Sequence, residues 1–208
     1  ADPAGFLHLE SFGMMLPAAV ILVATVAASS GIAGEERARR MSLLLAQPIS
    51  RARVYATVAA ASALYVLIVT VAMFLGTWAG IAMAGVDVSL ADLAAACLMG
   101  TLLGWFFGAL ALLLSAATGR SSVAVWATTG LAVAGYFGYT LLLAAGKEAW
   151  GWWSPFRAYL YGPPLMEGAS WWQPAWLAAG VVIFLAVESD VIRGRLEARF
   201  RVLKAATA

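Results

Sequence analysis

Long apolar runs, separated by short polar interruptions, make up most of this chain of 208 residues. Each run is roughly 20 residues or longer, which is about the length that an α-helix needs to cross the hydrocarbon core of a bilayer. The runs lack the alternation, with a period of two, that a membrane β-strand requires. Backbone groups in hydrocarbon must bond within their own segment, so we expect helices. The predicted membrane helices cover residues 12–34, 54–84, 93–117, 122–145 and 171–190.

Composition agrees with this pattern, because 63% of the residues are hydrophobic and only 12% are charged. A soluble domain of ordinary composition carries about 25% charged residues. We therefore predict an all-α membrane protein, a polytopic bundle of transmembrane helices that forms one domain over residues 1–208. The one cysteine, Cys97, excludes a disulfide within the chain. Neither Cys97 nor the one histidine, His8, has partners at the spacing of a metal site, so we expect no metal.

Positive charge is distributed unevenly over the predicted loops. Eleven of the 13 Lys and Arg residues fall on one side, in residues 35–53, at Arg120 and in the tail 191–208. The other side has Lys147 and Arg157. The positive-inside rule makes the arginine-rich side cytoplasmic, which predicts a multi-pass protein of the bacterial inner membrane with a cytoplasmic C-terminus. An odd number of helices with an external start also predicts a further helix ahead of residue 1.

The arginine-rich interruption between the first two predicted helices has an amphipathic pattern. From Glu35 to Gln47, apolar residues recur on one helical face, and Pro48 ends the pattern. We expect a short helix on the cytoplasmic surface that docks a cytoplasmic partner; the alternative is a loop whose charge serves topology alone. The candidate partner-binding residues within 35–53 are Glu35, Glu36, Arg37, Arg39, Arg40, Met41, Leu44, Leu45, Pro48, Ser50 and Arg51.

The predicted outer loop, 146–170, is followed at once by further aromatic residues. Five of the nine tryptophans fall between 146 and 173, and indole rings prefer the headgroup zone of a bilayer. Two interpretations stay open for this region: short elements lying at the outer leaflet, or an aromatic belt without further structure.

Small residues recur at helical spacing in two predicted helices, where they let a neighbouring backbone approach closely. Either packing within one subunit or a surface between two subunits accounts for them. The candidate packing residues are Ala96, Gly100, Gly104 and Gly108 in the third helix, and Gly76 and Gly80 in the second.

Chemistry of its own is not expected from this chain. The membrane helices carry no charged residue at mid-depth, which argues against an ion-coupled carrier. Gly146-Lys147 is not followed by the hydroxyl residue of a P-loop, and no nucleophile–base pair is evident. Glu188 and Asp190 either form a gate with Arg193 or Arg195, or lie at the helix exit and reach the interface.

At this point the residues suggest a family. The motif GEER at 34–37, followed by LLLAQPISR at 43–51, closely resembles the corresponding loop of ABC-2 type transporter permeases. The resemblance extends to the TGRS turn at 118–121, to SPF at 154–156 and to the charged exit of the last helix. Two departures stand out: Arg39-Arg40 and Ser42 replace the family's Gly-Thr pair and Glu, and the exit lacks the family's aromatic-Arg-Arg-Asp pattern.

The resemblance implies a six-helix permease subunit of a bacterial ATP-binding cassette exporter. It implies that residues 35–53 form the coupling helix, which seats in a separate ATPase subunit, and that an outer helical hairpin maps to about 150–168. It also implies a dimer of ATPase subunits, a second permease subunit that is identical or homologous, and surrounding lipid, but no nucleic acid. ATP and Mg²⁺ are then used by the ATPase, and this chain binds no cofactor and is not an enzyme.

A second hypothesis has the same segment recruit a different cytoplasmic protein to a membrane scaffold or regulator that transports nothing. A membrane-embedded enzyme is disfavoured, because the predicted helices lack acid, base, nucleophile and metal ligands.

Overall fold

The computed structural model of the chain describes residues 8–37, 51–162, 164 and 170–206. Every regular element in these residues is a helix, which confirms the predicted all-α fold. Five helices are long and apolar enough to cross a membrane. The long helices are α2 (Leu16–Arg37), α4 (Arg51–Ala84), α5 (Leu90–Thr118), α6 (Ser121–Ala144) and α9 (Trp172–Ala206). The short ones are the π-helix η1 (His8–Met15), the 3-10 helix η2 (Glu148–Gly151) and α7 (Pro155–Leu160).

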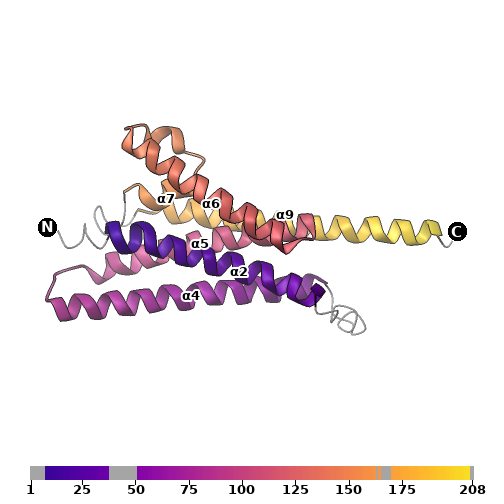
Figure 1. Cartoon of the computed structure of the whole chain (residues 1–208), viewed down its shortest axis with the longest axis horizontal. Coiled ribbons are helices and arrows are strands. Elements are labelled where there is room, and N and C mark those ends of the chain that lie inside the picture. The colour runs from indigo at the N-terminus through magenta and orange to yellow at the C-terminus, as the bar shows by residue number, and fades with distance from the viewer. Residues whose placement is uncertain (1–7, 38–50, 163, 165–169, 207–208) are drawn as a thin grey trace.

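Helix α5 is the centre of the bundle and packs against α2, α4, α6, α7 and α9. Figure 1 shows α2, α4 and α5 side by side, while α6 diverges from them toward η2. We call the end that holds η2 and α7 the tryptophan end. The opposite end, where α2 ends, α4 begins and α9 leaves the bundle, is the arginine end. A two-residue turn joins α5 to α6 there, and Gly119 adopts the left-handed conformation, with φ 68°, that ends α5.

Two helices extend beyond their predicted ends. Helix α2 includes residues 35–37, which the sequence pattern assigned to a separate short helix. Helix α9 continues through the predicted tail to Ala206. Residues 192–206 are rich in Arg, Ala and Leu, which are good helix formers, so nothing local stops α9 at the predicted membrane boundary.

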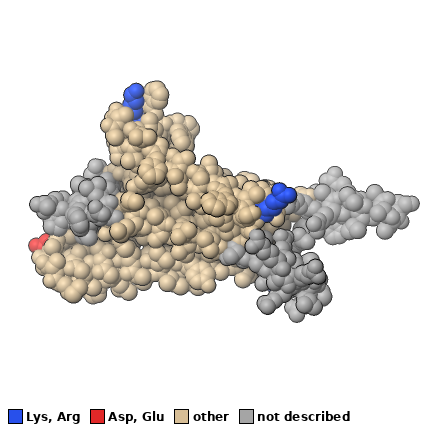
Figure 2. Space-filling view, viewed as in Figure 1, with Lys and Arg blue, Asp and Glu red and all other residues tan. Residues whose placement is uncertain are grey.

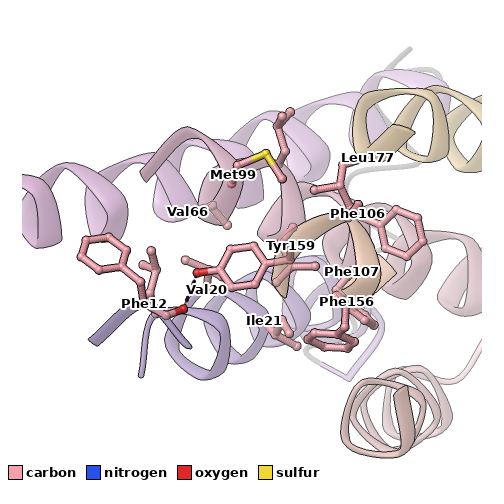
Figure 3. Packing of buried hydrophobic residues seen from close by; sticks show 14 of the residues in the cluster. Phe12, Val20, Ile21, Val66, Met99, Phe106, Phe107, Phe156, Tyr159 and Leu177 are labelled. Carbon is pink, nitrogen blue, oxygen red and sulfur yellow. Dashed lines mark hydrogen bonds between the residues drawn. The ribbon is translucent and has the colours of Figure 1, made fainter. Parts of the chain in front are cut away.

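The start of α2 is continuous with the π-helix η1, a feature that the sequence pattern did not predict. In a π-helix the carbonyl of Phe12 would accept from the N–H of residue 17, but that residue is a proline and has no N–H. The hydroxyl of Tyr159, on α7, donates to this carbonyl oxygen instead, with the two oxygens 2.6 Å apart. Figure 3 shows this bond beside the apolar core. It ties α7 to the beginning of α2.

A second set of bonds ties α7 to α9. The side-chain amide of Gln173, which is buried, donates to the carbonyl oxygens of Tyr161 and Gly162. The hydroxyl of Ser170 donates to the carbonyl oxygen of the same amide, 2.6 Å away. The short helix α7 is therefore held by hydrogen bonds to the beginning of α2 on one side and to α9 on the other.

Candidate functional site

An apolar crevice of about 340 Å³ lies between α2 and α6, near the tryptophan end. Both helices pack on α5, but α6 diverges from the bundle, and the divergence opens the space between them. The walls are made largely of aliphatic and aromatic side chains, among them Ile21, Leu22, Val133, Phe137 and Phe156. Such a lining suits the apolar part of a ligand.

Phe156, on α7, closes the crevice toward the core. It is 1% exposed, and its ring centroid lies 5.6 Å from that of Phe107 and 5.5 Å from that of Tyr136. Gly135 permits this approach, because a Cβ there would lie 3.3 Å from the Phe156 ring. Figure 3 shows Phe156 beside Phe107, and the two rings are tilted by 38° relative to each other. The anchoring of α7 thus positions one wall of the crevice.

Two buried threonines, Thr25 and Thr128, lie close in sequence to residues of the crevice but do not line it. Thr25 follows the lining residue Leu22 by about one turn of α2, and Thr128 precedes the lining residue Thr129 on α6. Both hydroxyl oxygens are buried, and neither has a hydrogen-bond partner in the described structure. Other threonines in the helices, Thr101 for example, donate to the carbonyl four residues earlier. The hydroxyls of Thr25 and Thr128 differ in having no such partner among the described residues.

The candidate partner-binding segment, 35–53, is described only at its edges. Glu35, Glu36 and Arg37 lie in the last turn of α2. Arg51 begins α4. The other predicted partner-binding residues lie outside the described residues, as does most of the predicted short helix. They are Arg39, Arg40, Met41, Leu44, Leu45, Pro48 and Ser50.

The small residues of α5 lie against two helices of the same chain. A Cβ at Gly100 would lie 2.6 Å from Cδ2 of Leu16, on α2, and one at Gly104 would lie 2.7 Å from Cγ1 of Val66, on α4. Gly108 faces the same two helices, and Ala96 is buried with them.

The glycines of α4 differ. A Cβ at Gly76 or at Gly80 would have no atom within 4 Å. Their face of α4 is open in this chain, and both line a cavity of about 550 Å³ between η1 and α4.

The tryptophan-rich region forms two short helices, η2 and α7, rather than an unstructured loop. Residues 163 and 165–168 of the predicted outer hairpin lie outside the described residues. Several of the tryptophans are largely exposed, with Trp150 at 70%, Trp152 at 68% and Trp171 at 88%. Exposed indoles at one end of an apolar bundle are typical of the headgroup zone.

Of the two acidic residues near the exit of α9, Glu188 is buried and Asp190 is exposed. One carboxylate oxygen of Glu188 has no partner among the described residues. The side chains of Arg193 and Arg195, predicted as gate partners, lie outside the described ones. The described residues contain no group of three His, Cys, Asp or Glu side chains placed to hold a metal ion.

Comparison with known proteins gives one match. A sequence model of the family described as "ABC-2 family transporter protein" matches residues 8–187. This range runs from the start of η1 into α9 and includes the crevice and segment 35–53. No curated protein and no solved structure matches the chain.

Proposed function

The chain belongs to the ABC-2 family of transporter proteins, and on that premise we propose that it is the permease subunit of an ATP-binding cassette exporter. The observation that carries the proposal is the family match over most of the helical bundle. The apolar crevice between α2 and α6 adds the space that a transport path requires.

Segment 35–53 receives the driving force in this proposal. A separate ATPase subunit, which uses ATP and Mg²⁺, grips the segment and moves it when its nucleotide sites close. Residues 35–37 are continuous with α2, and α2 forms one wall of the crevice. The other wall, α6, joins α5 through the short turn at Gly119. Displacement of the segment therefore moves one wall relative to the other.

An amphiphile is the substrate class that the crevice supports. Its apolar part lies along the aliphatic and aromatic walls, and its polar part meets the hydroxyl groups of Thr129 and Tyr136, which line the crevice. The side chains of Leu22, Val133 and Phe137 are each more than half exposed, so the crevice is open along the outside of this chain. A second permease subunit, identical or homologous, closes it.

Purification of the tagged chain from its native membranes tests the proposal. We expect an ATPase with a P-loop to be retained, and the triple variant Arg39→Glu, Arg40→Glu, Arg51→Glu to lower its retention about tenfold, because the charges oppose docking. Arg120→Glu, at the α5–α6 turn of the same end, is the matched control and keeps the ATPase. If the retained partner has no P-loop, the result supports the scaffold hypothesis instead. If the triple variant retains the ATPase as well as the unchanged chain does, the result contradicts the coupling role of segment 35–53.

The crevice is tested in the same complex. Val133→Trp fills the space with an indole ring, and we expect transport to fall while the ATPase stays bound. Leu131→Trp places the same ring at an equally exposed position of α6 that does not line the crevice, and it should transport normally. Equal losses in the two variants contradict a path through the crevice.

A further inference from the structure

Arg157 lies at the tryptophan end, outside the five apolar spans, and is held between two aromatic rings. Its guanidinium carbon lies 5.8 Å from the ring centroid of Tyr161 and 5.8 Å from that of Trp172. Tyr161 follows α7 and Trp172 begins α9, so two separate elements supply the rings. A guanidinium stacks well on aromatic faces and keeps the N–H donors at its edge free for other partners.

No acceptor for this guanidinium is found in the described part of the chain. Its Nε is buried and has no hydrogen-bond partner. The side chain makes no ion pair or hydrogen bond with any other described residue. A partly buried cation without an acceptor among the described residues is unfavourable there, so a bound anion would stabilise it.

The guanidinium is also held in place. Gln173 bonds the carbonyls of Tyr161 and Gly162, and Tyr159 bonds the carbonyl of Phe12. These bonds hold the backbone of α7 and the backbone at Tyr161. The ring of Tyr161 forms one side of the clamp around the guanidinium, and the ring of Trp172 forms the other. A donor fork that is fixed beforehand loses less freedom when it binds an anion.

The surroundings indicate what kind of molecule carries the anion. Trp171, Trp152 and Trp150 are largely exposed at this end, which places Arg157 at the depth of lipid headgroups. Figure 2 shows that charged side chains are sparse on the described surface in this view, with one basic group over the end of α6 that leads into η2. The anions most abundant at this depth of a membrane are lipid phosphates.

We propose that Arg157, clamped by Tyr161 and Trp172, binds a phosphate group carried by a phospholipid headgroup at the tryptophan end. The free N–H groups at the edge of the guanidinium pair with two phosphate oxygens, the geometry that arginine prefers for this anion. Phosphate binding at Arg157 requires neither the ATPase nor transport, so a failure of this proposal can be distinguished from a failure of the proposed function.

Lipid retention by the full chain tests this site. The chain is purified in a maltoside detergent, which contains no phosphate, and native mass spectrometry measures the binding of phosphatidylglycerol. A galactosyl diacylglycerol with the same acyl chains is the lipid control. We expect one tightly held phosphatidylglycerol per chain and no comparable glycolipid. Arg157→Gln should weaken phosphatidylglycerol binding about tenfold, to the level of the glycolipid.

Lys147→Gln is the matched protein control, because Lys147 is also basic, lies at the same end and stands over the ring of Trp150 at 5.5 Å. We expect its binding to stay within about twofold of the unchanged chain. Arg157→Lys keeps the charge but loses the planar fork, and Trp172→Leu removes half of the clamp. Both should weaken binding several-fold, and they test the site even if Arg157→Gln fails to fold.

Addition of inorganic phosphate in excess decides the source of the ligand. Displacement of the lipid shows that the site also takes phosphate from solution, and unchanged retention shows that it requires the lipid-borne group. The proposal is overturned if Arg157→Gln binds phosphatidylglycerol normally, if Lys147→Gln loses as much, or if the glycolipid binds as well.

Discussion

Tyr159 shows how one side chain joins distant parts of this fold. Its hydroxyl donates a hydrogen bond to the carbonyl oxygen of Phe12, which lies 147 residues earlier in the chain. That carbonyl cannot accept the bond of a π-helix from residue 17, because residue 17 is a proline. Burial raises the pKa of the Tyr159 hydroxyl above its usual value of 10.0, because the ionised form is disfavoured away from water. The neutral hydroxyl, which is the donor, is thus the form that the fold stabilises.

Tyr159→Phe should lower the free energy of unfolding by about 1–3 kcal/mol, because a buried carbonyl loses its only donor from α7. Thermal unfolding in detergent measures the loss. Tyr65→Phe is the control, since it removes the same hydroxyl from an exposed position of α4. A loss of equal size in both variants contradicts the role of the Tyr159–Phe12 bond.

The raised pKa gives this bond a pH dependence. Stability from Tyr159 is fully present below the unfolded pKa of about 10 and is lost as the pH rises above it, because the unfolded chain then ionises and the folded chain resists. The difference in free energy of unfolding between the unchanged chain and Tyr159→Phe should therefore shrink between pH 9 and pH 11, by roughly 1.4 kcal/mol per pH unit above the unfolded value, as measured by thermal unfolding at each pH.

At the scale of helices, α5 and α4 use glycine differently. Gly100, Gly104 and Gly108 let α2 and α4 approach α5 within the same chain. In a membrane, close packing of this kind replaces the hydrophobic effect as the cause of helix association. Gly76 and Gly80 face open space, so this surface of α4 is available for contacts with another chain or with lipid.

Gly104→Leu should destabilise the bundle by about 1–3 kcal/mol, because the added side chain would overlap Val66 and Val20. Gly80→Leu adds the same atoms where nothing lies within 4 Å, and the chain should fold as before. Yield of the monodisperse protein and its thermal unfolding measure both effects. If Gly104→Leu is as stable as Gly80→Leu, the packing described for α5 is incorrect.

At the scale of the whole molecule, the two ends of the bundle differ in chemistry. The tryptophan end carries the exposed indoles of Trp150, Trp152 and Trp171 together with Lys147 and Arg157, while the described helix ends at the arginine end carry Arg37, Arg51, Arg53 and Arg120. The distribution predicts that the arginine end faces the cytoplasm and that the tryptophan end faces outward.

Cysteine labelling in intact cells tests this orientation. Cys97 is buried, so it contributes little background. We expect Ala149→Cys, an exposed site on η2, to react with a maleimide that does not cross membranes. Ser122→Cys, an exposed site at the start of α6, should react only after the cells are opened. The reverse pattern would invert the topology and remove the basis for an ATPase docked on segment 35–53.

The sequence by itself determined that the protein is a bundle of five apolar membrane helices, together with their approximate positions. Helix length and hydropathy are set locally, because each backbone segment in hydrocarbon must satisfy its own hydrogen bonds. The arginine-rich motif and the residues that carry the family resemblance can also be recognised locally, because each lies in a short stretch of the sequence.

Only the tertiary structure decided which surfaces meet. The crevice depends on how α6 diverges from α2, and the clamp around Arg157 depends on Tyr161 and Trp172 arriving from separate elements. The π-helix η1 also depends on a distant contact, because the carbonyl of Phe12 accepts a hydrogen bond from Tyr159 of α7. Each of these features rests on contacts between residues far apart in the chain, and a periodic pattern of apolar residues specifies which face of a helix is buried but not which helix covers it.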